Sequence, residues 1–69
     1  MTDADILRAC EELKIHSFPP IDLGDGQRIP NWAAFSKSMK RMKDGKELYG
    51  QGETMREAVI DLLKKLDII

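Results

Sequence analysis

The feature that most constrains the fold of this chain is the junction that leads into its last helix. An extended segment, Lys46-Glu47-Leu48-Tyr49, runs into Gly50-Gln51-Gly52, and Thr54 and Glu57 follow in the Thr-x-x-Glu pattern of a capping box. In such a box the threonine hydroxyl accepts from the amide three residues on, and the glutamate reaches back to the amide of the threonine. The junction therefore predicts a strand, a tight turn and a helix, in that order.

Hydrophobic periodicity predicts a helix at each end of the sequence. The first runs from about Thr2 to Ile15, with Thr2 as its N-cap and His16 as a partner for the negative end of the helix dipole. The second runs from Met55 to about Ile68. Both carry apolar residues three and four positions apart: Ile6, Leu7, Cys10 and Leu13 in the first, and Met55, Val59, Leu62, Leu66 and Ile69 in the second.

The stretch 16–31 is rich in proline and glycine, which allow at most short extended pieces around Ile21 and around Arg28-Ile29. Asp25-Gly26 between these pieces predicts a hairpin turn. A phosphate-binding loop is the alternative, but no lysine-threonine pair follows the glycines, and a strand–glycine–helix context is missing. The turn is the favoured interpretation.

The segment 31–44 is ambiguous, and the fold depends on it. As a helix it would begin at Asn31, end at Gly45, and place Trp32, Phe35, Met39 and Met42 three or four residues apart. The periodicity favours that helix. However, a strand at 46–50 needs a partner, and Asp44-Gly45 lies where a hairpin turn would join the two. We therefore expect a strand for at least Trp32–Lys37.

The predicted fold is a single α+β domain spanning residues 1–69. It has the order helix, two or three antiparallel strands, helix, with both helices on one face of the sheet, and the alternative is a three-helix bundle. A domain of 69 residues has one small core and marginal stability. The predicted core is Ile6, Leu7, Cys10, Leu13, Phe35, Leu48, Val59, Leu62 and Leu66.

Composition points to a cytoplasmic protein. No apolar run approaches the roughly 18 residues of a membrane span. The first residues are acidic where a secretory signal would be basic, so we expect no export signal. The one cysteine, Cys10, has no partner for an internal disulfide, which fits a reducing compartment.

No residue pattern predicts catalysis, so we expect a protein that is not an enzyme and has no cofactor. Cys10 and His16 are the best nucleophile and base, but on one helix their side chains would point about 120° apart. Cys10 fits a small buried core residue better. One histidine and one cysteine do not make a metal site. Gly50-Gln51-Gly52 lacks the third glycine of a nucleotide fingerprint. The positive φ or the close approach that glycine permits where a strand turns into a helix explains it better.

Charge is segregated along the chain although the net charge is only −1. Residues 1–26 carry six acidic and two basic residues, which gives −4, and residues 47–69 carry five acidic and three basic ones, which gives −2. The middle segment, 27–46, carries +5. Its basic residues are the candidate nucleic-acid contacts: Arg28, Lys37, Lys40, Arg41, Lys43 and Lys46.

The order of elements resembles that of the double-stranded-RNA-binding domain, with Phe35, Gly50, Gly52 and Ala58 in comparable places. That family has a lysine-rich start to its last helix. Here Met55-Arg56-Glu57 stands in its place, which removes most of the family's phosphate contacts. The resemblance implies the fold without implying binding to duplex RNA.

The chain also resembles small phage and prophage accessory proteins of the helix–sheet–helix sandwich type, through Trp32-Ala33-Ala34 and a later Gly52, Thr54 and Ala58. HicB-type antitoxins are similar in their Gly-x-Thr-x-x-Glu-Ala ending, although they begin with a strand and this chain with a predicted helix. Both resemblances cover about the second half of the chain and imply a fold more than a function.

Two functions follow as hypotheses. The first is a non-enzymatic interaction module of the phage accessory kind, which binds a partner protein or a second copy of itself through apolar residues at Met39, Met42 and Ile68-Ile69. The second is nucleic-acid binding through the basic segment. It ranks lower because neither a helix nor a strand over 31–44 gathers these basic residues into a clean basic stripe. Trp32 and Tyr49 are single aromatics that fit core or rim positions better than a base-stacking platform, since stacking sites gather several aromatic rings on one face.

Overall fold

A computed structural model describes residues 2–69, apart from the side chains of Leu23, Gln27 and Lys43. The predicted α+β fold is confirmed, and the three-helix bundle is wrong because 31–44 contains no helix. In chain order the elements are α1 (Asp3–Glu12), β1 (Ile15–Phe18), β2 (Ile21–Gly24), β3 (Gln27–Ile29), β4 (Trp32–Ser36), β5 (Met42–Lys43), β6 (Lys46–Glu47), β7 (Gly50–Gly52) and α2 (Met55–Lys65).

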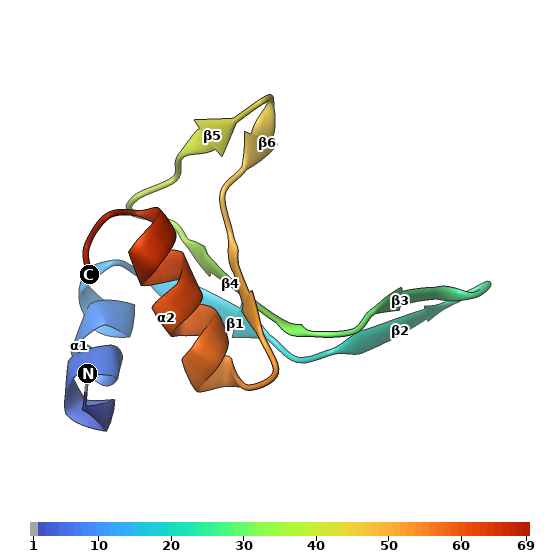
Figure 1. Ribbon diagram of the computed structural model, residues 1–69, viewed down its shortest axis with the longest axis horizontal. Helices are drawn as coiled ribbons and strands as arrows, with labels where there is room; N and C mark the ends of the chain where they lie inside the picture. The colour runs from blue at the N-terminus through green and yellow to red at the C-terminus, as the bar shows by residue number, and fades with distance from the viewer. Residues whose placement is uncertain (1) are drawn as a thin grey trace.

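Three of the strands form the central sheet, in the order β1-β4-β7 with both pairings antiparallel. In the register of this sheet, His16 lies opposite Phe35, and Ala34 lies opposite both Ser17 and Gly50. The pairs β2–β3 and β5–β6 form two separate hairpins. Figure 1 shows them as two arms that leave the sheet in different directions, one continuing β1 and β4 and the other following β4.

Each arm is closed by an Asp-Gly turn with left-handed backbone. Asp25 and Gly26 have φ values of 51° and 77°, and Asp44 and Gly45 have φ values of 53° and 76°. Aspartate and glycine tolerate this conformation better than other residues, which explains their position. The predicted turn at Asp25-Gly26 is confirmed. The second turn joins β5 to β6 instead of joining β4 directly to residues 46–50, and only Gly50–Gly52 pairs with β4.

The first strand was not predicted, since residues up to Ile15 were assigned to the helix. The chain leaves α1 after Glu12, and Lys14 adopts a left-handed φ of 50°. The Ser36 hydroxyl donates to the Leu13 carbonyl at 2.7 Å and fixes this corner. His16 consequently lies within β1, so its predicted role at a helix end is wrong.

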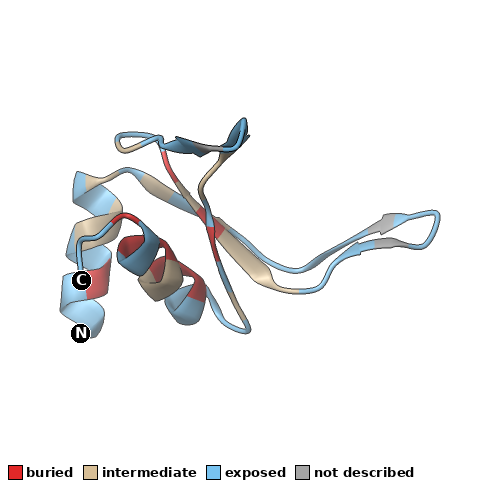
Figure 2. Cartoon of the chain, turned by 45° about the horizontal axis from the view of Figure 1, so that its top comes forward, coloured by how far each residue is buried: buried red, intermediate tan, exposed pale blue. Residues whose placement is uncertain are grey.

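The core lies between α2 and the sheet, as the buried residues of α2 and of the middle of the sheet show in Figure 2. Gly50 allows the approach of α2, because a Cβ at this position would overlap the Ala58 carbonyl oxygen and the Leu62 amide. The close-approach interpretation of the glycines in 50–52 is therefore confirmed. The buried hydrophobic residues are Ile6, Ala34, Ala58, Val59, Leu62, Leu63 and Leu66.

Four of the nine predicted core residues are buried: Ile6, Val59, Leu62 and Leu66. The prediction that Leu7 belongs to the core is wrong, since this residue is 62% exposed on the outer side of α1. Cys10 and Leu13 are only half-buried, because a three-stranded sheet is too narrow to cover the end of the α1 stripe, and Leu48 is half-buried in the segment between β6 and β7. Phe35 is half-buried too. On α2, the stripe residues Met55 and Ile69 are exposed.

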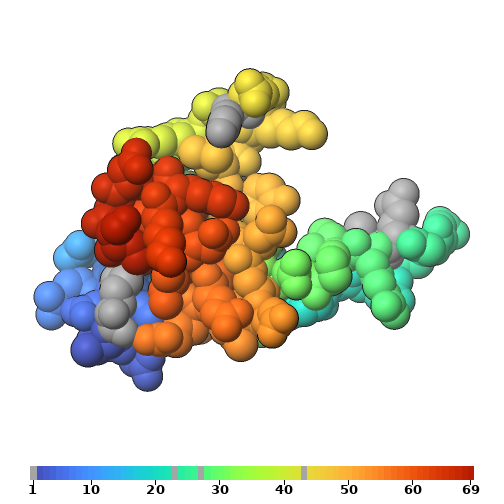
Figure 3. Space-filling view, in the orientation of Figure 1, coloured from blue at the N-terminus to red at the C-terminus, as the bar shows by residue number. Residues whose placement is uncertain are grey.

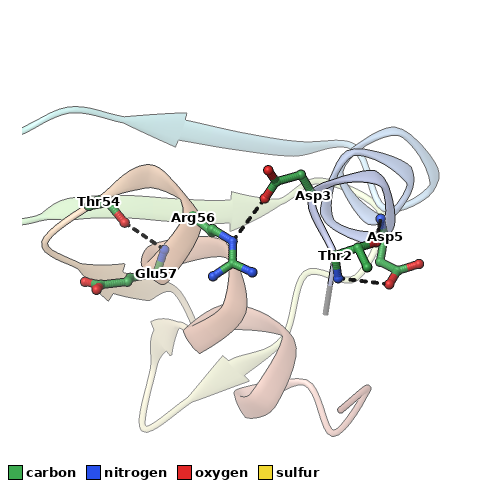
Figure 4. Close-up of polar contacts among 6 residues, drawn as sticks. All are labelled: Thr2, Asp3, Asp5, Thr54, Arg56 and Glu57. Carbon is green, nitrogen blue, oxygen red and sulfur yellow. Dashed lines mark hydrogen bonds and ion pairs between the residues drawn. The ribbon is translucent and has the colours of Figure 1, made fainter.

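The helix starts are stabilised by side chains, and an ion pair connects them (Figure 4). Thr54 accepts from the Glu57 amide as predicted, at 3.1 Å, but the Glu57 carboxylate accepts from the Glu53 amide and not from Thr54. A complete capping box forms instead at the start of α1, between Thr2 and Asp5. The Arg56 guanidinium lies 3.2 Å from the Asp3 carboxylate and joins α2 to α1.

Candidate functional site

One face of the central sheet carries no helix. Both α1 and α2 pack on the other face, where Ala34 and Ser36 point and are buried. Side chains alternate along a strand, so the neighbouring residues point the opposite way. We call this surface the open face. Its residues are His16 and Phe18 from β1, Ala33 and Phe35 from β4, Gln51 from β7, and Tyr49 from the segment just before β7.

Three aromatic rings meet on the open face, and we call them the aromatic row. The Phe18 and Phe35 ring centroids are 5.9 Å apart in an edge-to-face arrangement. The Phe35 and Tyr49 centroids are 5.4 Å apart in a stacked arrangement. Phe18 remains 46% exposed and Tyr49 42% exposed, so the row is a surface feature and not a second core. Sequence periodicity assigned Phe35 to the core, which is wrong because the residue lies in a strand and faces away from the helices.

Two hollows adjoin the aromatic row. An apolar one of about 250 Å³ lies at the base of the β2–β3 arm, with Pro19, Ile21, Ile29 and Ala33 beside the three rings. A larger one of about 590 Å³ is lined by Phe18 and Phe35 together with His16, Lys37 and Lys40, and by Glu47 from the β5–β6 arm. The space-filling view shows the β2–β3 arm standing clear of the body (Figure 3).

The six predicted basic residues are only partly brought together. Lys37 and Lys40 line the larger hollow beside the rings. Arg28 and Lys46 line further hollows that each include Tyr49. Arg41 is directed elsewhere, since its guanidinium lies 4.0 Å from the Asp67 carboxylate beyond the end of α2. The side chain of Lys43 lies outside the described residues.

Acidic residues are concentrated away from this surface. Asp3, Asp5, Glu11 and Glu12 belong to α1, which packs against β1 and α2 on the helix-bearing side of the sheet. The pKa of the Asp5 carboxyl is lowered by its hydrogen bonds with Thr2. The segregation of charge along the sequence thus becomes a partial segregation in space, although Glu47 lies among the basic side chains of the open face.

One lysine of α2 contacts the aromatic row directly. The Lys65 ammonium donates to the Tyr49 carbonyl oxygen at 3.0 Å and lies 5.6 Å from the centre of the Tyr49 ring. It also pairs with the Asp61 carboxylate at 2.9 Å, and that carboxylate accepts from the Gln51 amide at 3.0 Å. Partial burial opposes ionisation of Asp61, but the Gln51 hydrogen bond and Lys65 outweigh it and lower the pKa of the carboxyl.

The structure places the weak catalytic candidates apart. Cys10 packs against the core from α1, whereas His16 belongs to the open face on the other side of the sheet. Burial raises the pKa of the Cys10 thiol, which makes it a poorer nucleophile. Within residues 2–69 no group of three potential metal ligands comes together. None of the described helices is long and apolar enough to cross a membrane.

Sequence reasoning missed the aromatic row because no strand was predicted around Phe18 and because Phe35 was assigned to the core. A signal was present nevertheless. A hairpin centred on Asp25-Gly26 pairs Gly24 with Gln27, and eight residues further along each strand it pairs His16 with Phe35. Extending the predicted turn into one long hairpin would have placed Phe18 and Phe35 on the same face.

Comparisons with known proteins give no assignment: no protein-family model, no curated protein and no solved structure matches the chain. The resemblances to the double-stranded-RNA-binding domain, to phage accessory proteins and to HicB-type antitoxins therefore stay predictions.

Proposed function

We propose that this chain is a small non-enzymatic binding module whose open face binds single-stranded nucleic acid. The observation that carries the proposal is the aromatic row, three neighbouring and partly exposed rings with Lys37 and Lys40 in the adjoining hollow. Bases stack on aromatic rings and phosphates pair with lysines, so a single strand satisfies both halves of this surface. A duplex would offer its phosphates while keeping its bases stacked inside.

The arrangement changes the ranking that the sequence supports. From the sequence, Tyr49 and Trp32 are isolated aromatics, and a protein partner ranks first. In the fold, Tyr49 lies beside Phe35 and Phe18, which meets the requirement for several rings on one face.

The acidic net charge is compatible with an anionic ligand because charge acts locally at physiological salt. Interactions between exposed charges are largely screened beyond about 10 Å. The α1 carboxylates lie on the opposite side of the sheet, whereas Lys37 and Lys40 line a hollow on the open face in which Glu47 is the one carboxylate among the described residues. The local potential, and not the total of −1, governs binding there.

The test is a fluorescence-polarisation titration of labelled uridine and thymidine octamers at low salt. We expect both to bind more tightly than a duplex of the same length. Phe18→Ala should weaken binding by roughly tenfold, since one base–ring stack contributes about 1–3 kcal/mol. No binding of either octamer at tens of micromolar would refute the proposal.

A matched pair of charge-reversal variants distinguishes the effect of charge on the open face from the effect of the net charge of the chain. Lys37→Glu with Lys40→Glu changes the net charge by the same amount as Arg8→Glu with Lys64→Glu, but Arg8 and Lys64 belong to the helices. We expect the first pair of substitutions to abolish octamer binding and the second to preserve it. Equal losses in the two variants would mean that the open face is not the binding surface.

A protein partner or a second copy of the chain is the other candidate, favoured by exposed apolar side chains away from the aromatic row. Met42 is 60% exposed, and Ile68 and Ile69 are exposed at the C-terminal end. Surfaces of this kind often mark protein contacts. The self-association version predicts a concentration-dependent increase in mass by sedimentation equilibrium, which Ile68→Asp with Ile69→Asp should remove. A strict monomer at millimolar concentration would count against it.

A further inference from the structure

The ring of Tyr49 lies outside the paired strands. The pairing of β7 with β4 begins at Gly50, which lies opposite Ala34. Tyr49 comes just before Gly50 in the sequence and is therefore not paired with β4. Its neighbour Leu48 is tied by its amide to the Arg41 carbonyl at 2.8 Å. Phe18 and Phe35, by contrast, both belong to strands whose register fixes where their rings point. Tyr49 therefore needs a contact from another element to hold its ring against Phe35.

That contact comes from α2. The Lys65 ammonium touches the Tyr49 carbonyl oxygen, lies over the Tyr49 ring and pairs with Asp61. Asp61 in turn accepts from the amide of Gln51, two residues after Tyr49. The Asp61–Lys65 pair thus hydrogen-bonds to the backbone on both sides of Gly50. It connects α2, on one face of the sheet, to the Tyr49 ring on the other.

Lys65 lines a hollow together with Lys46 and Tyr49, but most of its hydrogen-bond donors are already engaged within the protein. Its ammonium has three donor hydrogens, and Tyr49 and Asp61 take two of them at 3.0 and 2.9 Å. Its neighbour Lys64 is exposed and makes no such contacts with the aromatic row. The two lysines therefore form a natural comparison: they are equal in charge and adjacent in sequence, but Lys65 contacts both Tyr49 and Asp61.

We infer that Lys65, held by Asp61, is a positioning residue for nucleic-acid binding: it acts through the Tyr49 ring and not on the ligand. The inference rests on the proposed function, because it concerns the same surface. It predicts that the Asp61–Lys65 pair controls affinity without contributing to the dependence of affinity on salt.

The first experiment uses the free protein and needs no ligand. Nuclear magnetic resonance shifts of the Tyr49 ring are compared in wild type, Lys65→Met and Lys64→Met. We expect the ring resonances to move in Lys65→Met and to stay in place in Lys64→Met. Unmoved resonances in Lys65→Met would overturn the inference even if wild type binds the octamers. Moved resonances combined with no octamer binding would instead refute the proposed function.

The second experiment measures the affinity of the labelled uridine octamer as a function of salt. We expect Lys65→Met to weaken binding about as much as Tyr49→Ala, roughly tenfold, with an unchanged log–log salt slope. The double variant Lys65→Met with Tyr49→Ala should bind the octamer no more weakly than either single variant. Lys65→Arg should keep most of the affinity. A slope reduced by about 0.7 in Lys65→Met would identify a direct phosphate contact and overturn the inference. Fully additive losses would overturn it as well.

Discussion

Single residues set how closely α2 approaches the sheet, and Gly50 is the clearest case. It is buried directly under the helix, and any side chain there would overlap the backbone of Ala58 and Leu62. Backbone atoms cannot move aside as a flexible side chain can, so the helix itself would have to shift. The same contact explains why β7 is so short and begins with glycine.

We expect Gly50→Ala to destabilise the domain by about 3 kcal/mol, a large share of the stability of a chain this small. Gly45→Ala is the matched control, since a Cβ there meets open space and only the left-handed φ of 76° opposes it. That cost is about 1 kcal/mol. Urea unfolding followed by circular dichroism measures both, and similar effects in the two variants would contradict this account of Gly50.

Asp61 gives a pH prediction at the same scale. Its pKa is lower in the folded protein than the usual value of 3.8. A carboxyl with a depressed folded pKa adds stability above its unfolded pKa, and that stability is lost as the pH falls through the folded pKa. The stability difference between wild type and Asp61→Asn should therefore be largest above about pH 5 and shrink toward about pH 3. A difference independent of pH would show that the charge of Asp61 is not what matters.

At the scale of elements, the β2–β3 arm is separable from the body. Its strands pair with each other, and none of the arm's described side chains is buried. It does supply Ile21 and Ile29 to the apolar hollow and Arg28 to the surroundings of Tyr49. The arm therefore belongs to the candidate site more than to the fold.

Replacing residues 21–29 with Asn-Gly should preserve the fold and weaken octamer binding. We expect a change in unfolding free energy below about 1 kcal/mol, because none of the described side chains in this segment is buried. For the full chain, the slope of log affinity for the octamer against log salt concentration should be about −3, for four phosphate contacts at roughly −0.7 each on a single strand. The slope should fall to about −2 when the arm is replaced, because Arg28 is lost with it. Circular dichroism and salt titrations measure these two quantities. Collapse of the fold on truncation would show that the arm is structural.

At the scale of the whole molecule, the buried residues are concentrated where α2 packs on the sheet. The chain measures 37 × 28 × 16 Å, and its buried residues lie on α2, β4, β7 and one position of α1. Both arms extend beyond this region (Figure 1). Both helices pack on one face of the sheet, so none of the described helices covers the open face.

Hydrogen exchange should reproduce this distribution. Amides of α2 and β4 should exchange most slowly, since they open only with the whole domain, and amides of the β2–β3 arm should exchange fastest. Exchange measured by mass spectrometry on peptides covering residues 19–30 and 55–66 distinguishes the two. Equal protection of the two peptides would mean that the arm is part of the cooperative unit.

The sequence by itself determined the features that depend on neighbouring residues. The last helix and its Thr54 cap, the first helix and the turn at Asp25-Gly26 all follow from periodicity, capping and turn chemistry. Each of these signals acts over a few residues, and the sequence states them directly.

Only the tertiary structure decided which side chains meet across the chain. Periodicity cannot tell which face of a strand is covered, so Phe35 was assigned to the core although it lies on the open face. The strand β1 was missed because its hydrogen-bond partners lie about twenty residues away in β4. The aromatic row and the contact between Lys65 and Tyr49 also join segments that are distant in the sequence. Pairing and packing between such segments are set by the fold, and local sequence patterns do not encode them.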